Sequence, residues 1–474
     1  MNRNGQDVFE PLLIRAMTEL DALQLLLLDL ISPRPVIDPA RISSLSAADW
    51  DRLLGLVRQH RLGPLLHWQL TQRRAGLPIP VAVKEELAMD LKRATLRALV
   101  MRREWVLIHR LLSAAGIPCL ALKGAFLAYH AYPQPGLRPL RDLDILVPTD
   151  EALRAFDTLI AGGLVRPLQY QGNAQAQMSI HKHLPPLLTA SGATVEVHAR
   201  LHNPDLTFQS PPPLTRERGP GRGGKLLNLD PPNPASLPQA GDGGEELHPD
   251  EGAAQGPDPS ADPAFWRRAL EVQAAGESLQ VPAPTDQLLH LIAHAILDHK
   301  FTNGPLILSD IAFLLERQPI DWTSFWQAAG QGRLRRACWL TLRLVETYWG
   351  GKHIGWPAES MALPDTDRAL RQAALLMLRD FNASSDVGLA HELGQEDSAR
   401  ARLGFLVDRL FPPKAQIAAA YPVRQDSALL YLYYLPHLWR LASQRVPGFL
   451  KSRRQPHVRD ELNHLNELEN WLTG

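Results

Sequence analysis

Apolar residues recur at three- and four-residue intervals through much of the first part of the chain, and this spacing predicts helices. One such row comprises Trp50, Leu53, Leu54 and Val57. Residues 83–115 continue the pattern over a long stretch, and Gly116 follows at the place where glycine commonly ends a helix. We therefore expect residues 1–116 to form a helical N-terminal region.

The pattern changes after Gly116, where short apolar runs replace the helical stripe. Such short runs are typical of buried strands, and strict alternation of apolar and polar residues is typical of a half-buried strand. The expected strands are residues 117–124, 142–148 and 193–201, with two or three further short strands before the last. Helices are expected at 125–132 and from Thr149 to Gly163. Residues 117–210 should thus form a compact α/β unit.

Residues 211–263 differ from both neighbouring regions. They contain 12 prolines and 9 glycines but no Phe, Tyr or Trp. Such a segment cannot bury enough apolar area to offset the entropy of ordering it, which predicts a disordered insertion. From Phe265 onward the pattern is helical to the end, so residues 264–474 are expected to form a helical C-terminal domain. Apolar stripes are clearest at 286–301, 306–317, 321–330 and 334–350.

An apolar stretch near the C-terminus, ALLYLYYLPHLW at 428–439, is too short to be a membrane span. It has 12 residues and contains Pro436 and His437, whereas a span needs about 20 apolar residues. We interpret it as a core helix. Because basic residues follow it, a helix that binds a membrane surface or a partner protein is the alternative.

Charge and cysteine content narrow the class of protein. The chain has 474 residues, 50 basic and 50 acidic side chains, and two cysteines, Cys119 and Cys338. The neutral balance provides no overall attraction to nucleic acid. Two distant cysteines exclude a disulfide framework and fit a reducing compartment. With no secretory signal at the N-terminus and no transmembrane segment, a cytoplasmic location is expected.

The strand at 142–148 carries two acids, Asp142 and Asp144, among Leu, Ile and Val residues. Because side chains alternate along a strand, both carboxylates point to the same face while the apolar residues face the core. Glu196 and His198 share a face of the strand at 193–201, so Glu196 is the third carboxylate of a possible two-metal site. The alternative for Asp-x-Asp alone is an acidic surface strand. Since like charges repel, losing either aspartate should leave the fold intact or slightly stabilised.

Basic and histidine residues add to this constellation. Lys123-Gly124 lies between a strand and a helix, where backbone N–H groups and a lysine can bind phosphate. His290 and His294 stand four apart, a spacing that binds Zn²⁺ or simply packs one helix face. His181, Lys182 and His183 reach the same cleft or remain solvated. A Ser-His-Asp or Cys-His nucleophile has no support in the sequence.

As a set, these segments resemble a known family. They are LALKG (120–124), GLRPLRDLDILV (136–147), VEVHARL (195–201), LLHLIAHAILDH (288–299) and LILSDIAFLLE (306–316). In this order they resemble the bacterial "uncharacterised nucleotidyltransferase" family, within the superfamily of DNA polymerase beta and the aminoglycoside nucleotidyltransferases. The resemblance implies an α+β fold, with a small mixed sheet of nucleotidyltransferase type, flanking helices, and helical N-terminal and C-terminal regions.

The resemblance also implies an activity, namely metal-dependent transfer of a nucleoside monophosphate from an NTP to an acceptor, with release of pyrophosphate. Asp142, Asp144 and Glu196 would be the catalytic residues and would hold two Mg²⁺ ions. The expected nucleotide-binding residues are Lys123, Gly124, Arg138, Arg141 and His198. The neutral charge favours a small-molecule or sugar acceptor over a long nucleic acid, and the C-terminal helices are a possible site for a protein partner.

The chain departs from the superfamily pattern at the turn after the first strand and at the third acid. Lys123-Gly124 stands where the superfamily has Gly-Ser, and the third acid is Glu196 rather than the commoner aspartate. The alternatives are therefore a non-catalytic binding or scaffold protein with this fold, and a transferase that modifies tRNA ends. Each of the basic residues expected at phosphate has a surface or carboxylate-pairing role as its alternative.

Overall fold

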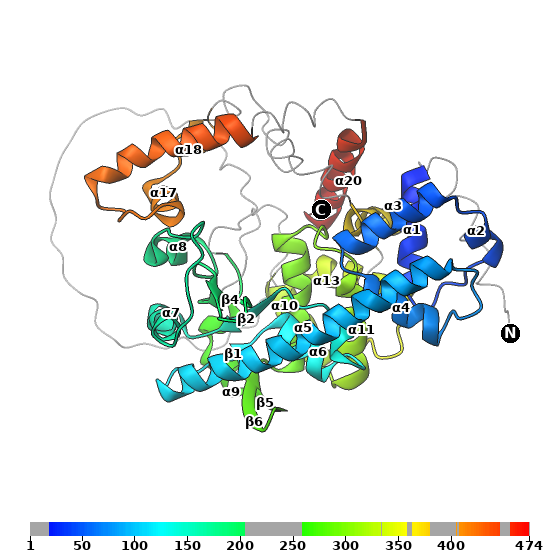
Figure 1. Ribbon diagram of the computed structural model, residues 1–474, viewed down its shortest axis with the longest axis horizontal. Coiled ribbons are helices and arrows are strands. Elements are labelled where there is room, and N and C mark those ends of the chain that lie inside the picture. Colours follow the sequence, from blue (N-terminus) through cyan, green and yellow to red (C-terminus); the bar gives the residue numbers. More distant parts are fainter. Residues whose placement is uncertain are drawn as a thin grey trace, which may run out of the picture. The chain divides into compact units, whose positions relative to one another are not determined.

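The computed structural model describes residues 19–203, 258–332, 334–357, 363–379, 404, 407–445 and 456–473. Its N-terminal part is helical, as the apolar spacing predicts (Figure 1). The helices are α1 (Glu19–Ile31), α2 (Pro39–Ser43), α3 (Ala47–Gln59), α4 (Gly63–Gln72) and α5 (Val81–Ala114). Ser46 caps α3 in a reciprocal capping box with Asp49. Gly116 follows α5 with φ +70°, the left-handed conformation that a residue past a helix end commonly adopts.

The expected α/β unit follows directly. Its elements are β1 (Leu120–Ala121), α6 (Lys123–His130), η1 (Pro135–Leu137), β2 (Asp142–Leu146), η2 (Thr149–Glu151), α7 (Ala152–Ala161), α8 (Ala174–Ile180), β3 (Leu187–Leu188) and β4 (Thr194–His198). The strand expected at 117–124 is shorter than predicted, because Lys123 already belongs to α6. Between α7 and β4, the described chain forms one short strand and a helix in place of several short strands.

One expectation about the later part of the chain is wrong. Residues 270–281 were expected to be helical, but they form a hairpin of β5 (Leu270–Ala274) and β6 (Glu277–Val281). The hairpin turns at Ala275 and Gly276, which have φ values of +51° and +84°. Before it come η3 (Pro259–Ala261) and α9 (Pro263–Arg267).

The helices expected after the hairpin are present. They are α10 (Pro284–Ala293), the π-helix η4 (His294–Asp298), α11 (Leu306–Arg317), α12 (Trp322–Gln331), α13 (Arg335–Tyr348), α14 (Thr366–Met377), α17 (Lys414–Ala420), η5 (Ala428–Tyr433), α18 (Tyr434–Arg440), the π-helix η6 (Leu441–Arg445) and α20 (Pro456–Thr473). The interpretation of 428–439 as a core helix is wrong. Leu435 and Trp439 are 68% and 75% exposed, and of the segment only Leu430 is buried.

The six strands form one mixed sheet in the order β3-β4-β2-β1-β6-β5. β2 pairs with β4 in parallel and with β1 in antiparallel orientation. β6 joins β1 in parallel, so the late hairpin extends a sheet whose other strands lie before residue 200. The small mixed sheet with flanking helices confirms the expected α+β class.

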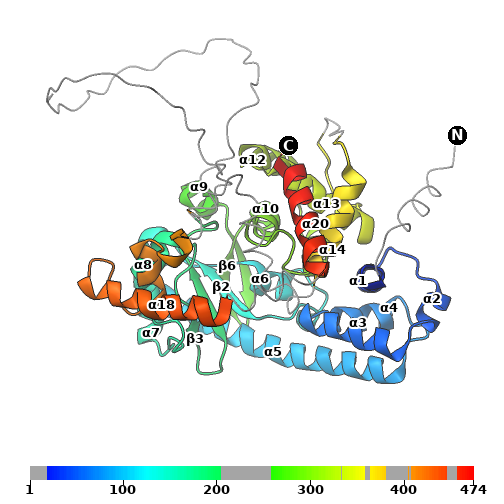
Figure 2. The ribbon, with the colours of Figure 1, turned by 90° about the horizontal axis from the view of Figure 1, so that it is seen from above.

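The two faces of the sheet are covered by different elements. Leu143, Ile145, Val195 and Val197 are fully buried in the main core, against which α5 and α7 pack. On the opposite face, Leu146 packs with residues of α9 and β1 in a smaller core. Figure 2 shows α5 and α7 on one side of the sheet, with α9 and α10 on the other. This second side carries the acids predicted to be catalytic.

Two further expectations concern other parts of the chain. Of the insertion expected at 211–263, residues 211–257 lie outside the described residues, whereas Asp258 is packed and accepts hydrogen bonds from the backbone of Leu201 and His202. Within the described part of the chain, no helix has the length and apolarity that crossing a membrane requires.

Candidate active site

Two neighbouring parallel strands bring the predicted acids together. Asp142 and Asp144 lie on β2, and Glu196 and His198 lie on β4. The register places Asp144 opposite Glu196, with Asp142 opposite Thr194 and Leu146 opposite His198. Because residues two apart share a strand face, all four polar side chains lie on the side opposite α5 and α7. The shared face predicted from the alternation is therefore present in the structure.

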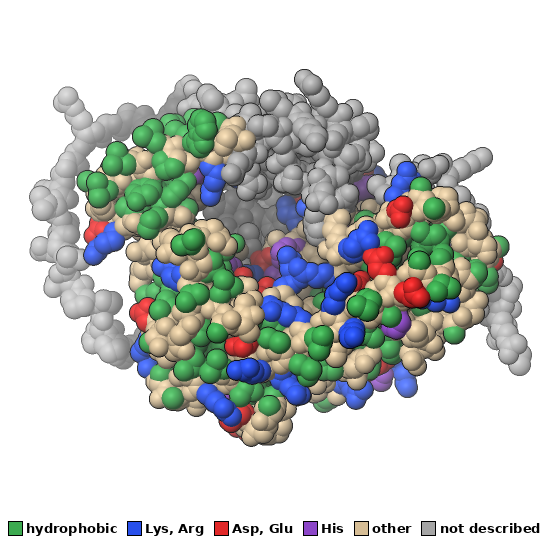
Figure 3. Space-filling model, in the orientation of Figure 1, with side chains coloured by type: hydrophobic (Ala, Val, Ile, Leu, Met, Phe, Trp, Pro, Cys, Tyr) green, Lys and Arg blue, Asp and Glu red, His purple; other side chains and the backbone are tan. Residues whose placement is uncertain are grey.

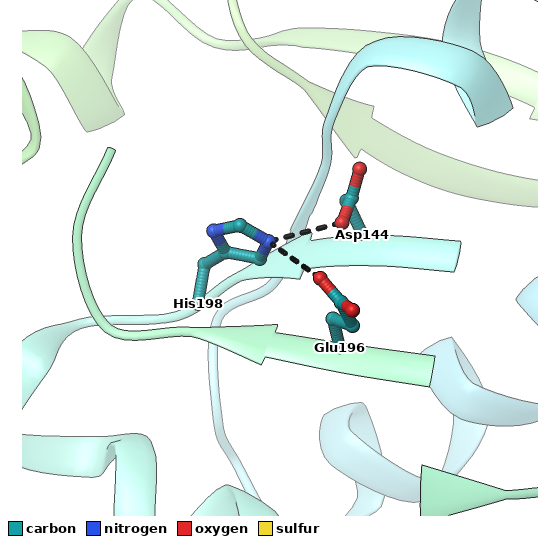
Figure 4. Close-up of side chains that lie close together, drawn as sticks. All are labelled: Asp144, Glu196 and His198. Carbon is teal, nitrogen blue, oxygen red and sulfur yellow. Dashed lines mark hydrogen bonds and ion pairs between the residues drawn. The ribbon is translucent and has the colours of Figure 1, made fainter. Parts of the chain in front are cut away.

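Asp144, Glu196 and His198 converge on one point (Figure 4). His198 Nε2 lies 3.0 Å from Asp144 Oδ1 and 3.8 Å from Glu196 Oε2. His198 is fully buried and Asp144 is 8% exposed, whereas Glu196 and Asp142 are half-buried. Asp142 lies two residues before Asp144, at the start of β2, and is not part of this three-residue group.

The surroundings of Asp142, Asp144 and Glu196 shift the pKa values of these three acids in different directions. Burial would raise the pKa of Asp144, but Lys123 and the hydrogen bond from His198 hold it well below its usual range. Burial and the nearby Asp144 raise the pKa of Asp142. Burial, with Asp144 and Asp142, raises the pKa of Glu196 to about 7. Asp144 is thus ionised at neutral pH, while Glu196 exchanges its proton near pH 7.

The donor set of this group fits a divalent cation. The ligand atoms of Asp144, Glu196 and His198 lie within 4.8 Å of one another. Adjacent ligands of an octahedral ion at about 2.1 Å stand roughly 3 Å apart, so the observed separations need little adjustment. Burial lowers the pKa of His198 to about 4, so its imidazole is neutral. Its Nε2 donates an N–H to Asp144 in one tautomer, and in the other tautomer it offers a lone pair to a cation.

Lys123 is paired with a carboxylate in this structure. Its Nζ lies 3.3 Å from Asp144 Oδ2, and the lysine is 8% exposed. The backbone at Lys123 has φ +45°, a left-handed conformation that is unusual for a residue with a side chain. Such local strain persists where surrounding structure holds it in place, and it concentrates at functional sites.

Gly124 makes room for an arginine. A Cβ at this position would stand 2.6 Å from Nη1 of Arg138 and 2.9 Å from Leu140 Cδ2. The close approach that the glycine permits is therefore made by Arg138 of the same chain. Lys123-Gly124 is thus built into the site through its contacts with Asp144 and Arg138.

Arg138 itself joins two of the sequence motifs. Its Nε and Nη2 donate to Asp310 Oδ1 and Oδ2 at 3.0 and 2.9 Å, and Tyr132 donates its hydroxyl to Oδ1 at 2.7 Å. Asp310 is 3% exposed, and although burial opposes it, this carboxylate raises the pKa of Arg138. The pair connects the segment before β2 to α11.

A second polar cluster lies beside the acids, where α10 passes into the π-helix. Lys182 is 6% exposed and forms an ion pair with Asp298, which also accepts a hydrogen bond of 2.6 Å from His294 Nδ1. With Nδ1 donating, the neutral imidazole of His294 carries its lone pair on Nε2. His294 is near enough to Asp144 for the two side chains to interact electrostatically. π-helical turns of this kind are frequent at functional sites.

The other histidines singled out by spacing lie in the same region. The rings of His290 and His294 stack with centroids 6.1 Å apart, and neither ring nitrogen of His290 has a hydrogen-bond partner among the residues that the structure describes. They do not form a three-ligand metal group in the described structure, where the group at Asp144 is the one identified. His183 lies 3.9 Å from Glu196 Oε2, so the 181–183 segment does reach the site.

Arg141, one of the basic residues predicted to bind phosphate, is exposed. The sequence did not predict a further arginine near the site, Arg61. Arg61, at the turn between α3 and α4, is near enough to Arg138, Arg141 and Asp142 to interact with them electrostatically. Figure 3 shows Lys and Arg side chains gathered beside a hollow in which acidic and histidine side chains are visible. No motif marks Arg61 in the sequence, because its nearness to these residues depends on how α4 packs.

The sequence matches the family model described as "Uncharacterised nucleotidyltransferase" over residues 46–226 and 246–350, more than half of the chain. The chain belongs to this nucleotidyltransferase family. The match confirms the family inferred from the motifs, and it includes every acid of the site. It also covers α10 and α11, so the histidine cluster and Asp310 belong to the same matched region. Among curated proteins and solved structures, none matches the chain.

Proposed function

We propose that the protein transfers a nucleoside monophosphate from an NTP to an acceptor hydroxyl or phosphate, releasing pyrophosphate, and that the reaction depends on divalent metal. The observation that carries this proposal is the placement of Asp142, Asp144 and Glu196 on one face of two adjacent parallel strands. Convergent carboxylates on a rigid sheet are suited to hold Mg²⁺ or Mn²⁺ against phosphate oxygens. Family membership supports the same reaction class.

Each acid of the site, and His198 beside them, would have a distinct role in the reaction. Asp144, ionised throughout the neutral range, and Glu196 would hold the cations, which when bound neutralise phosphate charge and polarise the phosphorus under attack. Asp142 would complete the acidic face beside them. Glu196, with a pKa of about 7, is suited to accept the proton of the acceptor's nucleophile at neutral pH. His198 would keep Asp144 in its orientation through the 3.0 Å hydrogen bond.

The position of Lys123 supports a role in substrate binding in which its ammonium group leaves Asp144 and binds a phosphate of the substrate. Its ammonium now neutralises Asp144, and a cation bound by Asp144 would free it for a phosphate oxygen. Arg138 uses two nitrogens on Asp310, which leaves Nη1, beside Gly124, for a phosphate contact. The neutral overall charge favours a small-molecule or sugar acceptor over a long nucleic acid. A cytoplasmic location remains a prediction, consistent with two buried free cysteines.

The test is transfer of labelled nucleotide. Each of the four NTPs, labelled at the α-phosphorus, is incubated with the protein, Mg²⁺ or Mn²⁺, and a fractionated cell extract, and labelled products are separated. We expect one NTP to label a small molecule with release of pyrophosphate, and Asp142→Asn and Glu196→Gln to abolish labelling. Asp150→Asn, at an exposed acid just after β2, is the matched control and should behave as the wild type.

The outcomes separate the alternatives. Label in the RNA fraction would identify a transferase acting on RNA ends in place of the small-molecule acceptor. Nucleotide binding without transfer to any fraction would indicate a binding protein with this fold. Labelling that persists in both Asp142→Asn and Glu196→Gln would refute the assignment of these acids.

A further inference from the structure

Arg61 and Arg141 are two arginines beside the acidic face whose side chains have no partner within the described part of the chain. Arg61 is half-buried and Arg141 is exposed. The side chains of Arg138 and Lys123, by contrast, are engaged with Asp310 and Asp144. Among the described residues, neither Arg61 nor Arg141 has a side-chain hydrogen bond or an ion pair within 4 Å, so their guanidinium donors are available for a ligand.

The packing of three elements brings these arginines together. Arg61 lies two residues before α4, which packs against η1, and η1 leads through Arg138 to Arg141 and the start of β2. His60, the neighbour of Arg61, places its Nδ1 3.1 Å from where a Cβ of Gly304 would stand. His299, on the same loop after the π-helix, is close enough to Arg141 for that charge to affect its pKa. His60, which adjoins Arg61, and Arg141 therefore both lie near one loop, residues 299–304, at the edge of the site.

The positive charges of Arg61 and Arg141 repel each other. Burial first, and then the charge of Arg141, lower the pKa of Arg61 to about 10, with Asp142 acting in the opposite sense. Arg61 also adopts φ +56°, a strained conformation for a residue with a side chain. A bound anion would relieve the repulsion between the guanidinium groups, and the planar fork of arginine is suited to phosphate oxygens.

We propose that Arg61 and Arg141 together bind the polyphosphate of the nucleoside triphosphate, so that the N-terminal helical region forms part of the substrate site. This inference rests on the proposed function and extends it, because the strand motifs alone assign no role to α3 and α4. Lys123 and Arg138 start from internal ion pairs, whereas Arg61 and Arg141 bind the anion without first giving up a partner.

Binding measurements test this without knowledge of the acceptor. The full-length protein is titrated calorimetrically with inorganic tripolyphosphate and with each of the four NTPs, always with Mg²⁺. We expect Arg61→Gln and Arg141→Gln each to weaken binding of tripolyphosphate and of the preferred NTP by roughly tenfold to a hundredfold, the loss of a charge-assisted contact. Arg61→Lys, which keeps the charge but not the fork, should fall between wild type and Arg61→Gln.

Arg58→Gln is the matched control, since Arg58 lies one turn earlier on α3 and is 56% exposed in an ion pair with Glu86. It should bind as the wild type does, and circular dichroism should show all variants folded. If the wild type binds no NTP, the proposed function itself fails. If the wild type binds and Arg61→Gln binds equally well, the inference about Arg61 is overturned while the proposed function stands. Weakened NTP binding with unchanged tripolyphosphate binding would also overturn it, by placing Arg61 at the nucleoside.

Discussion

The two aspartates of the Asp-x-Asp strand should respond differently to removal. Asp144 holds Lys123 through an ion pair and accepts a hydrogen bond from His198, and all three residues are at most 8% exposed. Asp142 is half-buried, and its raised pKa shows that its ionised form is unfavourable there. We therefore predict that Asp144→Ala destabilises the metal-free protein and that Asp142→Ala does not.

The magnitude follows from what each substitution leaves behind. Asp144→Ala leaves a buried ammonium without its partner and a buried N–H of His198 without an acceptor. Breaking a buried ion pair from one side typically costs about 3–5 kcal/mol, and we expect about 3 kcal/mol because Lys123 retains some access to water. Asp142→Ala should change the free energy of unfolding by less than about 0.5 kcal/mol. The sequence expectation that neither loss destabilises is therefore revised for Asp144.

Urea unfolding followed by circular dichroism at pH 7.5, with EDTA present, measures both effects. The double variant Lys123→Met/Asp144→Ala should recover at least about 1 kcal/mol relative to the sum of the single effects, because the ammonium left unpaired is also gone. Equal losses for Asp142→Ala and Asp144→Ala, or strict additivity in the double variant, would show that the Lys123–Asp144 contact does not contribute as described.

Other features of the site give three further predictions. Asp310→Asn should lower the free energy of unfolding by about 2–4 kcal/mol in urea denaturation, because Arg138, whose side chain is only 17% exposed, loses its partner, and adding Arg138→Met should restore part of it. Because Glu196 must lose its proton to bind a cation and has a pKa of about 7, Mn²⁺ affinity measured by calorimetry should fall roughly tenfold from pH 8 to pH 6. Glu196→Gln should abolish that pH dependence. Gly124→Ala should destabilise by about 1–3 kcal/mol in thermal unfolding, since its Cβ meets Arg138 Nη1 at 2.6 Å.

Local pattern was sufficient for the acidic face of the sheet. Alternation along residues 142–147 places the acids on one side because a strand has a period of two, and the same rule places Glu196 with His198. Which residue stands opposite which depends on strand register, and only the structure shows that Asp144, and not Asp142, meets Glu196. Sequence reasoning therefore placed the acids of the candidate site on one face of the sheet but did not reveal the difference between its two aspartates.

Features that depend on contacts between distant parts of the chain could not be predicted from the local sequence pattern. Arg138 was expected at phosphate, and its pairing with Asp310 became visible only once α11 was placed. Arg61 carries no local signal, because no motif marks the turn before α4 in the sequence. The hairpin at 270–281 does carry a signal, alternating apolar residues around Gly276, but this signal is short compared with the helical patterns that follow it. The apolar 428–439 segment shows that apolarity alone does not establish burial.

The central claim is that Asp144 and Glu196 form a divalent-cation site that acts together with a bound polyphosphate. Electron paramagnetic resonance of Mn²⁺, titrated into the full-length protein with and without inorganic tripolyphosphate, tests it most directly. We predict that the wild type binds Mn²⁺, that tripolyphosphate tightens this binding, and that Asp144→Asn and Glu196→Gln each weaken it at least about tenfold while Asp150→Asn does not. Mn²⁺ binding that is absent from the wild type, or equal in wild type, Asp144→Asn and Glu196→Gln, would contradict the claim.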